Sequence, residues 1–316
     1  MYVLDTQKIG RKISTARKAK NMTQLALADQ LGVSYQEISN WERGQSAPDI
    51  DKLPDLAQAL DLSLNDLFDM PDAEKKVVTI RQEDAPVDAE TLTEFAPMIK
   101  PDTLSKKVRV DAEDFSVDDV RAIAPFIGED TLAALMHEHE NDAHFGELVV
   151  SAAPFLSSEY LDQQVDALLA SGTDIDNKTA RRLLPFIGKA KVDALLARLA
   201  ARGDIDDDEL VHYFPFASAA ALGAVVSERE HDMTFVSKAA PFLPTERIDA
   251  MFKQAAANED VSLKDLQRLV PFVSSDVLKN TVVELINSGD HEYKLHDLMG
   301  LLPFLGDDDI LSLIRK

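Results

Sequence analysis

The residues with the most specific chemistry lie on one face of a short predicted helix, residues 34–44. Ile38 and Trp41 are its apolar positions, and their spacing marks the side of the helix that faces a protein core. The remaining positions carry an aromatic ring, amides, a hydroxyl and a guanidinium, all able to form hydrogen bonds. The outward-facing residues are Tyr35, Gln36, Ser39, Asn40 and Arg43.

Two of these side chains suit the reading of base edges. Gln36 and Asn40 can each donate one hydrogen bond to an adenine and accept another, which is how side chains distinguish bases in the major groove of DNA. Tyr35 could contact a thymine methyl group or a phosphate. The alternative is an ordinary solvated helix face, which also carries polar residues.

The elements around this helix are set by capping residues. Thr23 can cap the start of a preceding helix, and Gly32 stands where that helix needs a left-handed residue to end. Ser34 and Glu37 have the spacing of a capping box, and Gly44 ends the helix that they start. Two short helices joined by a tight turn are therefore predicted. Further helices are predicted from Gly10 to Lys20, from Asp49 or Asp51 with Pro54 in its first turn, and from Ser63 to Phe68.

The segment from Thr23 to Gly44, TQLALADQLGVSYQEISNWERG, resembles the helix-turn-helix of the Cro/λ-repressor-like (XRE) family. The resemblance extends over about residues 6–70 and implies a five-helix DNA-binding domain. It implies that bases are contacted by Tyr35, Gln36, Ser39 and Asn40, and that phosphates are contacted by Gln24 and Arg43.

The same resemblance implies an ion pair between two helices. The family often pairs a basic residue at the end of the first helix with an acid in the Trp-Glu-x-Gly segment, and here these residues are Arg17 and Glu42. Such a pair would hold the first helix against the third. The alternative is two independent surface charges.

The net charge of −23 is unusual for a protein that binds DNA, but it is unevenly distributed. Residues 1–44 carry 7 basic and 4 acidic side chains, whereas residues 71–316 have a net charge of −21. Because phosphates repel carboxylates, we expect the acidic part to lie away from a bound duplex. The alternative is that the acidity only supplies solubility.

A repeated Pro-Phe unit fills the rest of the chain. Its prolines recur every 26 to 32 residues, and seven of the eight are followed by Phe. Apolar residues at fixed positions around each proline predict two short antiparallel helices per copy, stacked into an α-solenoid that resembles HEAT-like arrays in general character. The Phe after each proline is predicted to belong to the core; the alternative is a row of ligand-binding aromatic residues. The prolines are Pro97, Pro125, Pro154, Pro185, Pro215, Pro241, Pro271 and Pro303.

The predicted fold class is thus all-α, with a helix-turn-helix domain at 1–70, a linker at 71–87 and about eight repeats at 88–316. The linker reads as a tether without a sustained helical period, and Val77 to Ile80 within it are β-prone.

Other functional classes find little support in the sequence. The chain has no cysteine, which excludes disulfides and thiolate metal sites and fits a reducing cytoplasm. No signal peptide or membrane span is expected. His137, His139 and His144 lack the spacing of a zinc helix, and no catalytic constellation is visible. We therefore expect no enzyme activity, no metal and no cofactor.

The function predicted from the sequence is a DNA-binding transcription regulator, most simply a repressor. The expected partners are double-stranded DNA, a second copy of the chain, and a peptide or protein on the repeats, which would serve as a sensor or oligomerisation domain. Two alternatives remain open: a peptide-responsive regulator of the quorum-sensing type, and an interaction scaffold that DNA binding localises. An acidic groove would favour a basic peptide.

Overall fold

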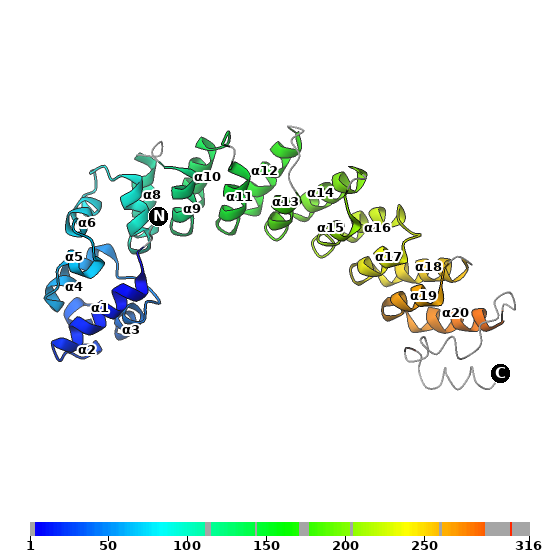
Figure 1. Ribbon diagram of the computed structural model, residues 1–316, viewed down its shortest axis with the longest axis horizontal. Coiled ribbons are helices and arrows are strands. Elements are labelled where there is room, and N and C mark those ends of the chain that lie inside the picture. Colours follow the sequence, from blue (N-terminus) through cyan, green and yellow to red (C-terminus); the bar gives the residue numbers. More distant parts are fainter. Residues whose placement is uncertain are drawn as a thin grey trace. The chain divides into compact units, whose positions relative to one another are not determined.

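The computed structural model describes residues 4–110, 115–142, 144–170, 177–202, 205–258 and 261–287, together with residue 304 (Figure 1). Every regular element in these ranges is a helix, which confirms the predicted all-α class. The chain divides into two compact units, Met1–Ser157 and Ser158–Lys316, and each is described by itself.

The first unit begins with five α-helices, as expected from the sequence. A short 3₁₀ turn at Ile50–Lys52 leads into the fourth of them, because Asp49 caps the turn and not the α-helix itself. The five are α1 (Thr6–Ala19), α2 (Gln24–Leu31), α3 (Tyr35–Glu42), α4 (Leu53–Leu60) and α5 (Leu64–Phe68).

The caps around α2 and α3 form as their sequence predicts. The Thr23 side chain accepts a hydrogen bond from the backbone of Ala26, and Gly32 ends α2 with φ +62°. Ser34 and Glu37 form both hydrogen bonds of the capping box. These local interactions fix the turn between α2 and α3, and therefore the direction in which α3 leaves it.

The segment expected to be a linker contains a packed helix, α6 (Ala73–Arg81). Its buried residues, Ala73, Val77 and Ile80, recur at helical spacing. The prediction of a tether without helical period is wrong for this stretch. Because burial of this apolar face outweighs the β-propensity of Val77 to Ile80, the segment is helical and not extended.

Contacts within the first unit attach the five-helix module to the first repeat. The rings of Phe68 and Phe95 meet edge to face with their centroids 5.3 Å apart. Lys76 of α6 forms a 2.9 Å ion pair with Glu94 of the first repeat helix. The module is therefore held against the repeat by packed side chains.

Helix pairs follow α6, and seven of the eight predicted copies lie in the described residues. The first helices of the pairs are α7 (Ala89–Phe95), α9 (Val117–Ile123), α11 (Phe145–Ala152), α13 (Asn177–Leu183), α15 (Asp207–Val211), α17 (Met233–Ala239) and α19 (Leu263–Leu269). The second helices are α8 (Pro101–Val110), α10 (Glu129–Glu138), α12 (Ser158–Ala170), α14 (Lys189–Arg202), α16 (Ala219–Ser227), α18 (Thr245–Ala256) and α20 (Ser275–Asn287). The copy around Pro303 lies outside the described residues, apart from Phe304.

Equivalent helices of successive copies contact each other within each unit. In the first unit α7 contacts α9 and α9 contacts α11; in the second, α14 contacts α16, α17 contacts α19 and α18 contacts α20. This is the nearest-neighbour packing of an α-solenoid. Several of the first helices begin at a capping residue whose side chain accepts backbone hydrogen bonds. These residues are Asp88, Ser116, Asp206, Asp232 and Ser262.

A hydrogen bond that the sequence did not reveal joins successive copies. The backbone N–H three residues after the proline of one copy donates to a side chain on the second helix of the preceding copy. The pairs are Gly128 with Ser105 (3.2 Å), Ser157 with Glu129 (2.8 Å), Gly188 with Asp162 (2.7 Å), Ser218 with Asp193 (2.7 Å) and Ser274 with Asp249 (2.8 Å). In one copy the donor position is occupied by Pro244, which has no N–H. The matching acceptor position is occupied by Gly223, which has no side chain to accept a hydrogen bond.

Removing one of these acceptors should loosen the second unit. Asp193→Ala leaves the Ser218 N–H without its carboxylate, and a lost part-buried hydrogen bond of this kind costs about 1–3 kcal/mol of folding free energy. Urea unfolding followed by circular dichroism measures the change. Asp193→Asn keeps an acceptor oxygen and serves as the control; equal losses in both variants would contradict this role.

The phenylalanines after the repeat prolines are not in the core, contrary to the prediction. Phe155 and Phe242 are each 39% exposed, and those of the other described copies are partly exposed. The core is formed instead by the two residues that precede each proline, such as Tyr213 and Phe214, which are buried. The proline ends the first helix in a tight turn, and this turn directs the following ring outward.

Candidate nucleic-acid interface

The outward face of α3 carries the five side chains predicted for it. Ile38 and Trp41 are buried against α1 and α2, which places the intervening residues on the opposite side. Tyr35 is 52% exposed, and Gln36 and Arg43 are also exposed. Ser39 and Asn40 are half-buried. The helix therefore presents a polar surface that its own core orients.

Hydrogen bonds along α3 join these residues into a row. The Oδ1 atom of Asn40 accepts from Gln36 Nε2 (3.0 Å) and from Arg43 Nη2 (2.9 Å). Arg43 Nε donates to the Ser39 carbonyl (3.1 Å). The row holds the three side chains of Gln36, Asn40 and Arg43 in register, and a base edge that approaches it would replace the hydrogen bond between the two amides by bonds to itself.

Arg17 and Glu42 lie together in a bidentate ion pair between α1 and α3. Arg17 Nε is 2.5 Å from Glu42 Oε1, and Nη2 is 2.9 Å from Oε2. Arg17 also donates to the Met22 carbonyl (2.6 Å) and is 7% exposed. The Gln24 amide donates to the same carboxylate at 2.7 Å. Gln24 is thus part of this network, and one of its amide hydrogens is already engaged by the Glu42 carboxylate.

The charges of this pair shift both pKa values. The hydrogen bond to Glu42 raises the pKa of Arg17 above its usual value. Burial acts to raise the pKa of Glu42, but the hydrogen bonds from Arg17 and Gln24 outweigh it, and the pKa is lowered overall. Both groups therefore stay charged at neutral pH.

Gly10 allows α1 and α3 to approach closely, a role that the sequence analysis did not assign. A Cβ atom at this position would meet the Trp41 carbonyl oxygen well inside contact distance and would lie 2.9 Å from that of Glu42. The signal in the sequence is a glycine within a helix, where it is intrinsically unfavourable and needs a packing reason.

Several cations of the five-helix module are bonded within the protein. Lys20 donates to the Ala59 carbonyl (3.0 Å) and Lys52 to that of Leu31 (3.1 Å), at the ends of α4 and α2. Their charges therefore stabilise helix ends. Of the basic residues in 1–44, Lys20 is therefore bonded to the end of a helix, as Arg17 is to Glu42.

Comparison with known proteins identifies the N-terminal segment. Residues 13–67 match a family model described as Helix-turn-helix. This segment is an XRE-type helix-turn-helix. The match begins within α1 and ends within α5, so it covers the capped turn, α3 and the buried contacts that orient it.

Two curated proteins resemble the helix-turn-helix part. One is the cryptic phage CTXphi transcriptional repressor RstR of Vibrio cholerae, 35% identical over 60 residues, which are 19% of this chain and 54% of that protein. The other is the uncharacterized HTH-type transcriptional regulator y4aM of Sinorhizobium fredii, 34% identical over 65 residues, which are 20% of this chain and 46% of that protein. The matched region spans about half the length of these relatives.

One solved structure matches along most of the chain. The apo form of the competence regulator ComR from Streptococcus vestibularis has 15% sequence identity, with 90% of this chain and 99% of that chain covered. The TM-score is 0.20.

In the described part of the chain, no group of three or more His, Asp and Glu side chains is placed to hold a metal ion. None of the described helices is both long and apolar enough to cross a membrane. His139, one of the clustered histidines, is instead engaged with Asp142 (2.7 Å) and the Phe115 carbonyl (2.8 Å).

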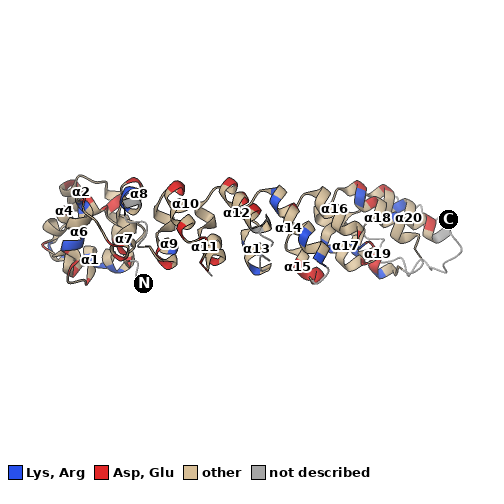
Figure 2. Cartoon of the chain, turned by 90° about the horizontal axis from the view of Figure 1, so that it is seen from above, with Lys and Arg blue, Asp and Glu red and all other residues tan. Residues whose placement is uncertain are grey.

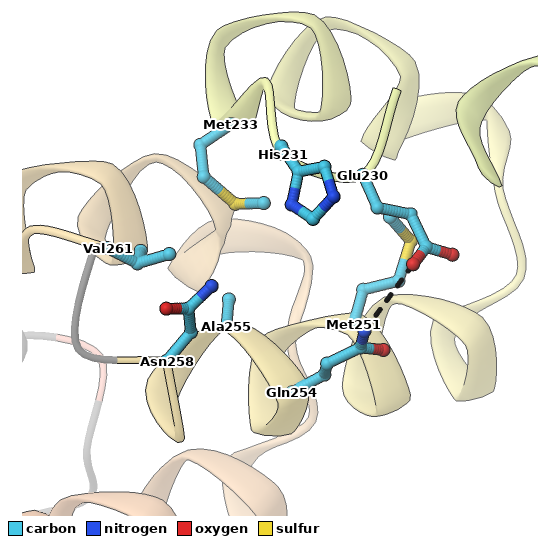
Figure 3. Close-up of a pocket in the computed structure, with 8 residues that line it drawn as sticks. All are labelled: Glu230, His231, Met233, Met251, Gln254, Ala255, Asn258 and Val261. Carbon is cyan, nitrogen blue, oxygen red and sulfur yellow. Dashed lines mark hydrogen bonds between the residues drawn. The ribbon is translucent and has the colours of Figure 1, made fainter. Parts of the chain in front are cut away.

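The second unit contains a cavity of about 270 Å³ beside α18 (Figure 3). Its polar residues include His231 and Gln254, whose Nε2 lies 3.4 Å from a Glu230 carboxylate oxygen. Its size is close to the lower end of small-molecule sites. The apolar lining is formed by Met233, Met251, Ala255 and Val261.

Proposed function

We propose that the chain is a transcription regulator that reads a DNA sequence through α3. The observation that carries this proposal is the hydrogen-bonded row of Gln36, Asn40 and Arg43 on the exposed face of the helix-turn-helix. Gln36, Asn40, Tyr35 and Ser39 are the proposed base contacts. Arg43, and Gln24 through its remaining donor, are the proposed phosphate contacts.

The test is the double variant Gln36→Ala/Asn40→Ala. DNA sites are first selected from a random duplex library with the unchanged protein, and affinity is then measured on the best site. Each lost base contact should cost about 1–3 kcal/mol of binding free energy, mostly for the specific site. Gln58→Ala, at an exposed amide on α4, is the control. Unchanged specific affinity in a folded double variant would contradict the assignment.

A dimer is the expected assembly. A single helix-turn-helix module makes few contacts, and two copies on half-sites about 34 Å apart are the usual arrangement. We propose a homodimer that acts as a repressor. Sedimentation velocity of the free protein and the spacing of the selected half-sites test this arrangement together.

A sensing role for the repeats is the second candidate, and the cavity beside α18 favours it. A peptide or small molecule bound there would control DNA binding. Release of DNA on addition of peptide fractions would support a peptide-responsive regulator. A stoichiometric protein captured from lysate, without any effect on DNA binding, would favour a scaffold instead.

A further inference from the structure

One junction between successive copies in the second unit is built differently from the other described ones. Elsewhere a backbone N–H of one copy donates to a side chain of the preceding copy, as Ser218 does to Asp193 at 2.7 Å. Between the fifth and sixth copies these two positions are Pro244 and Gly223, so both the donor and the acceptor are absent. The hydrogen bond that links the other copies therefore cannot form here.

An arginine side chain occupies the space beside Gly223 at this junction. Arg247 of α18 donates through Nη2 to the Gly223 carbonyl (2.6 Å) and to the Ser227 hydroxyl (2.5 Å) of α16. The guanidinium lies where a larger residue would place its side chain, because a Cβ atom on Gly223 would be 2.9 Å from Arg247 Cζ. With this side chain between them, α16 and α18 make less extensive contact than α14 makes with α16, or α18 with α20.

The cavity of about 270 Å³ lies further along the same face of α18 (Figure 3). Met251 and Gln254 follow Arg247 by four and seven residues, which places all three on one side of the helix. His231 and Met233, at the start of α17 and just before it, lie across the cavity from α18. The cavity is therefore located beside the loosely packed junction.

Two methionine side chains form much of the apolar lining. Met233 and Met251 are each only 8% exposed, although both border the cavity. Their thioether sulfurs are polarisable and make favourable contacts with aromatic rings. An apolar cavity of about 150 Å³ is large enough for benzene. A cavity of about 270 Å³ can therefore hold an aromatic ring together with a short chain.

The charge of the lining favours a cation. Among the described residues that line the cavity there is one carboxylate, Glu230, and no lysine or arginine. Glu230 is half-buried, and its hydrogen bond within the described part of the chain comes from the neutral amide of Gln254, at 3.4 Å. Acidic and basic residues are interspersed along the second unit (Figure 2). The sign of the charge at this site is therefore set by Glu230, which has no counter-charge in the lining.

We propose that this cavity binds a small primary amine whose apolar body is about the size of one aromatic ring. The ammonium group lies at the Glu230 carboxylate, and the Gln254 carbonyl oxygen can accept another of its hydrogen bonds. The ring packs against Met233 and Met251. As a signal, the amine rests on the sensing role proposed for the repeats, and its binding is measured apart from that role.

The probe is 2-phenylethylammonium, added to the full-length protein and followed by ligand-observed NMR. Binding should be saturable at roughly millimolar concentration, which is what a ligand of about nine non-hydrogen atoms can supply. 2-Phenylethanol and 3-phenylpropanoate are the neutral and anionic comparisons. Each should bind about tenfold more weakly than the amine or not at all, because neither forms a charge-assisted hydrogen bond with a carboxylate.

Two variants separate the charge of the cavity from its volume. Glu230→Gln keeps the size of the side chain and should weaken amine binding about tenfold, with binding of 2-phenylethanol nearly unchanged. Ala255→Leu adds bulk to the lining and should weaken both ligands. Glu246→Gln, which removes an exposed carboxylate from the first turn of α18, is the matched control and should bind as the unchanged protein does. Circular dichroism establishes that each variant is folded.

The proposal is overturned by an absence of saturable amine binding, by equal binding of 3-phenylpropanoate, or by unchanged amine binding in folded Glu230→Gln. The tripeptide Phe-Gly-Gly carries the same ring and an ammonium group on a longer chain. If it binds more tightly than the amine, the occupant is the end of a peptide and not a free amine, which also overturns the proposal.

The affinity for the selected DNA site, measured with and without saturating amine, is a separate readout. If the amine binds and leaves this affinity unchanged, the cavity is a binding site and the sensing role is contradicted. If the amine does not bind, the proposed site is overturned, whereas DNA binding through α3 is unaffected.

Discussion

Gly10→Ala is expected to destabilise the helix-turn-helix module by about 1–3 kcal/mol and to weaken DNA binding with it. The new Cβ atom would clash with the carbonyl oxygens of Trp41 and Glu42, which are backbone atoms that no side-chain rotation can move. Helix propensity alone would favour alanine by about 1 kcal/mol, so a net loss isolates the steric effect. α1 would have to move away from α3, and the buried ion pair beside it would open.

Trp41 makes this change measurable in the full chain. It is the only tryptophan of the protein and lies at the contact between α1 and α3, so its fluorescence reports on this module. Gly128→Ala is the control, because its Cβ would meet only Ser105 Oγ, at 4.0 Å. A Gly10→Ala protein with an unchanged fluorescence melting curve would contradict the close approach.

Glu42→Ala is expected to cost about 3–5 kcal/mol, because it leaves the buried guanidinium of Arg17 without a counter-charge. Gln24 loses its acceptor at the same time. Arg17→Met/Glu42→Leu removes both charges and should recover much of the loss. Denaturant unfolding followed by Trp41 fluorescence measures all three proteins. A loss of less than about 1 kcal/mol would mean that the pair behaves as an exposed one.

The Arg17–Glu42 ion pair should make the stability of the protein depend on pH. The pKa of Glu42 is lower in the folded protein than its ordinary value of 4.5. The ionised carboxylate therefore contributes fully to the free energy of unfolding above pH 4.5. The contribution is lost as the pH falls through the lower, folded pKa. The unchanged protein should therefore lose stability on acidification below about pH 4 more steeply than Glu42→Gln, which has no carboxyl group to protonate. If the stability of the two proteins falls in parallel as the pH is lowered, the lowered pKa of Glu42 is contradicted.

Much of the helix-turn-helix could be predicted because its signals are local. Thr23, Gly32 and the Ser34–Glu37 capping box act within one helical turn of their own positions, so sequence spacing is enough to locate them. The outward set on α3 follows from helical periodicity once Ile38 and Trp41 are assigned to the core. The hydrogen bonds that join this set, and the turning of Gln24 toward Glu42, depend on side-chain positions that spacing does not specify.

Two predictions on the rest of the chain were wrong for a common reason. Composition predicts a tether at residues 71–87, where residues 73–81 form α6, and hydrophobicity predicts the repeat phenylalanines in the core. Both properties describe a residue alone, whereas burial depends on what lies opposite it. Val77 is buried by neighbours distant in sequence, and Phe242 is left exposed because the preceding residues already fill the core.

The sequence by itself determined the helical class, the period of the repeats and the caps around α2 and α3, because these depend on residues within a few positions of one another. Tertiary structure alone decided that α1 approaches α3 at Gly10, that side chains such as Asp193 link successive copies, and that the phenylalanines after the repeat prolines are left partly exposed. Each of these outcomes depends on distances between residues far apart in the chain, and those distances are set only when the helices pack.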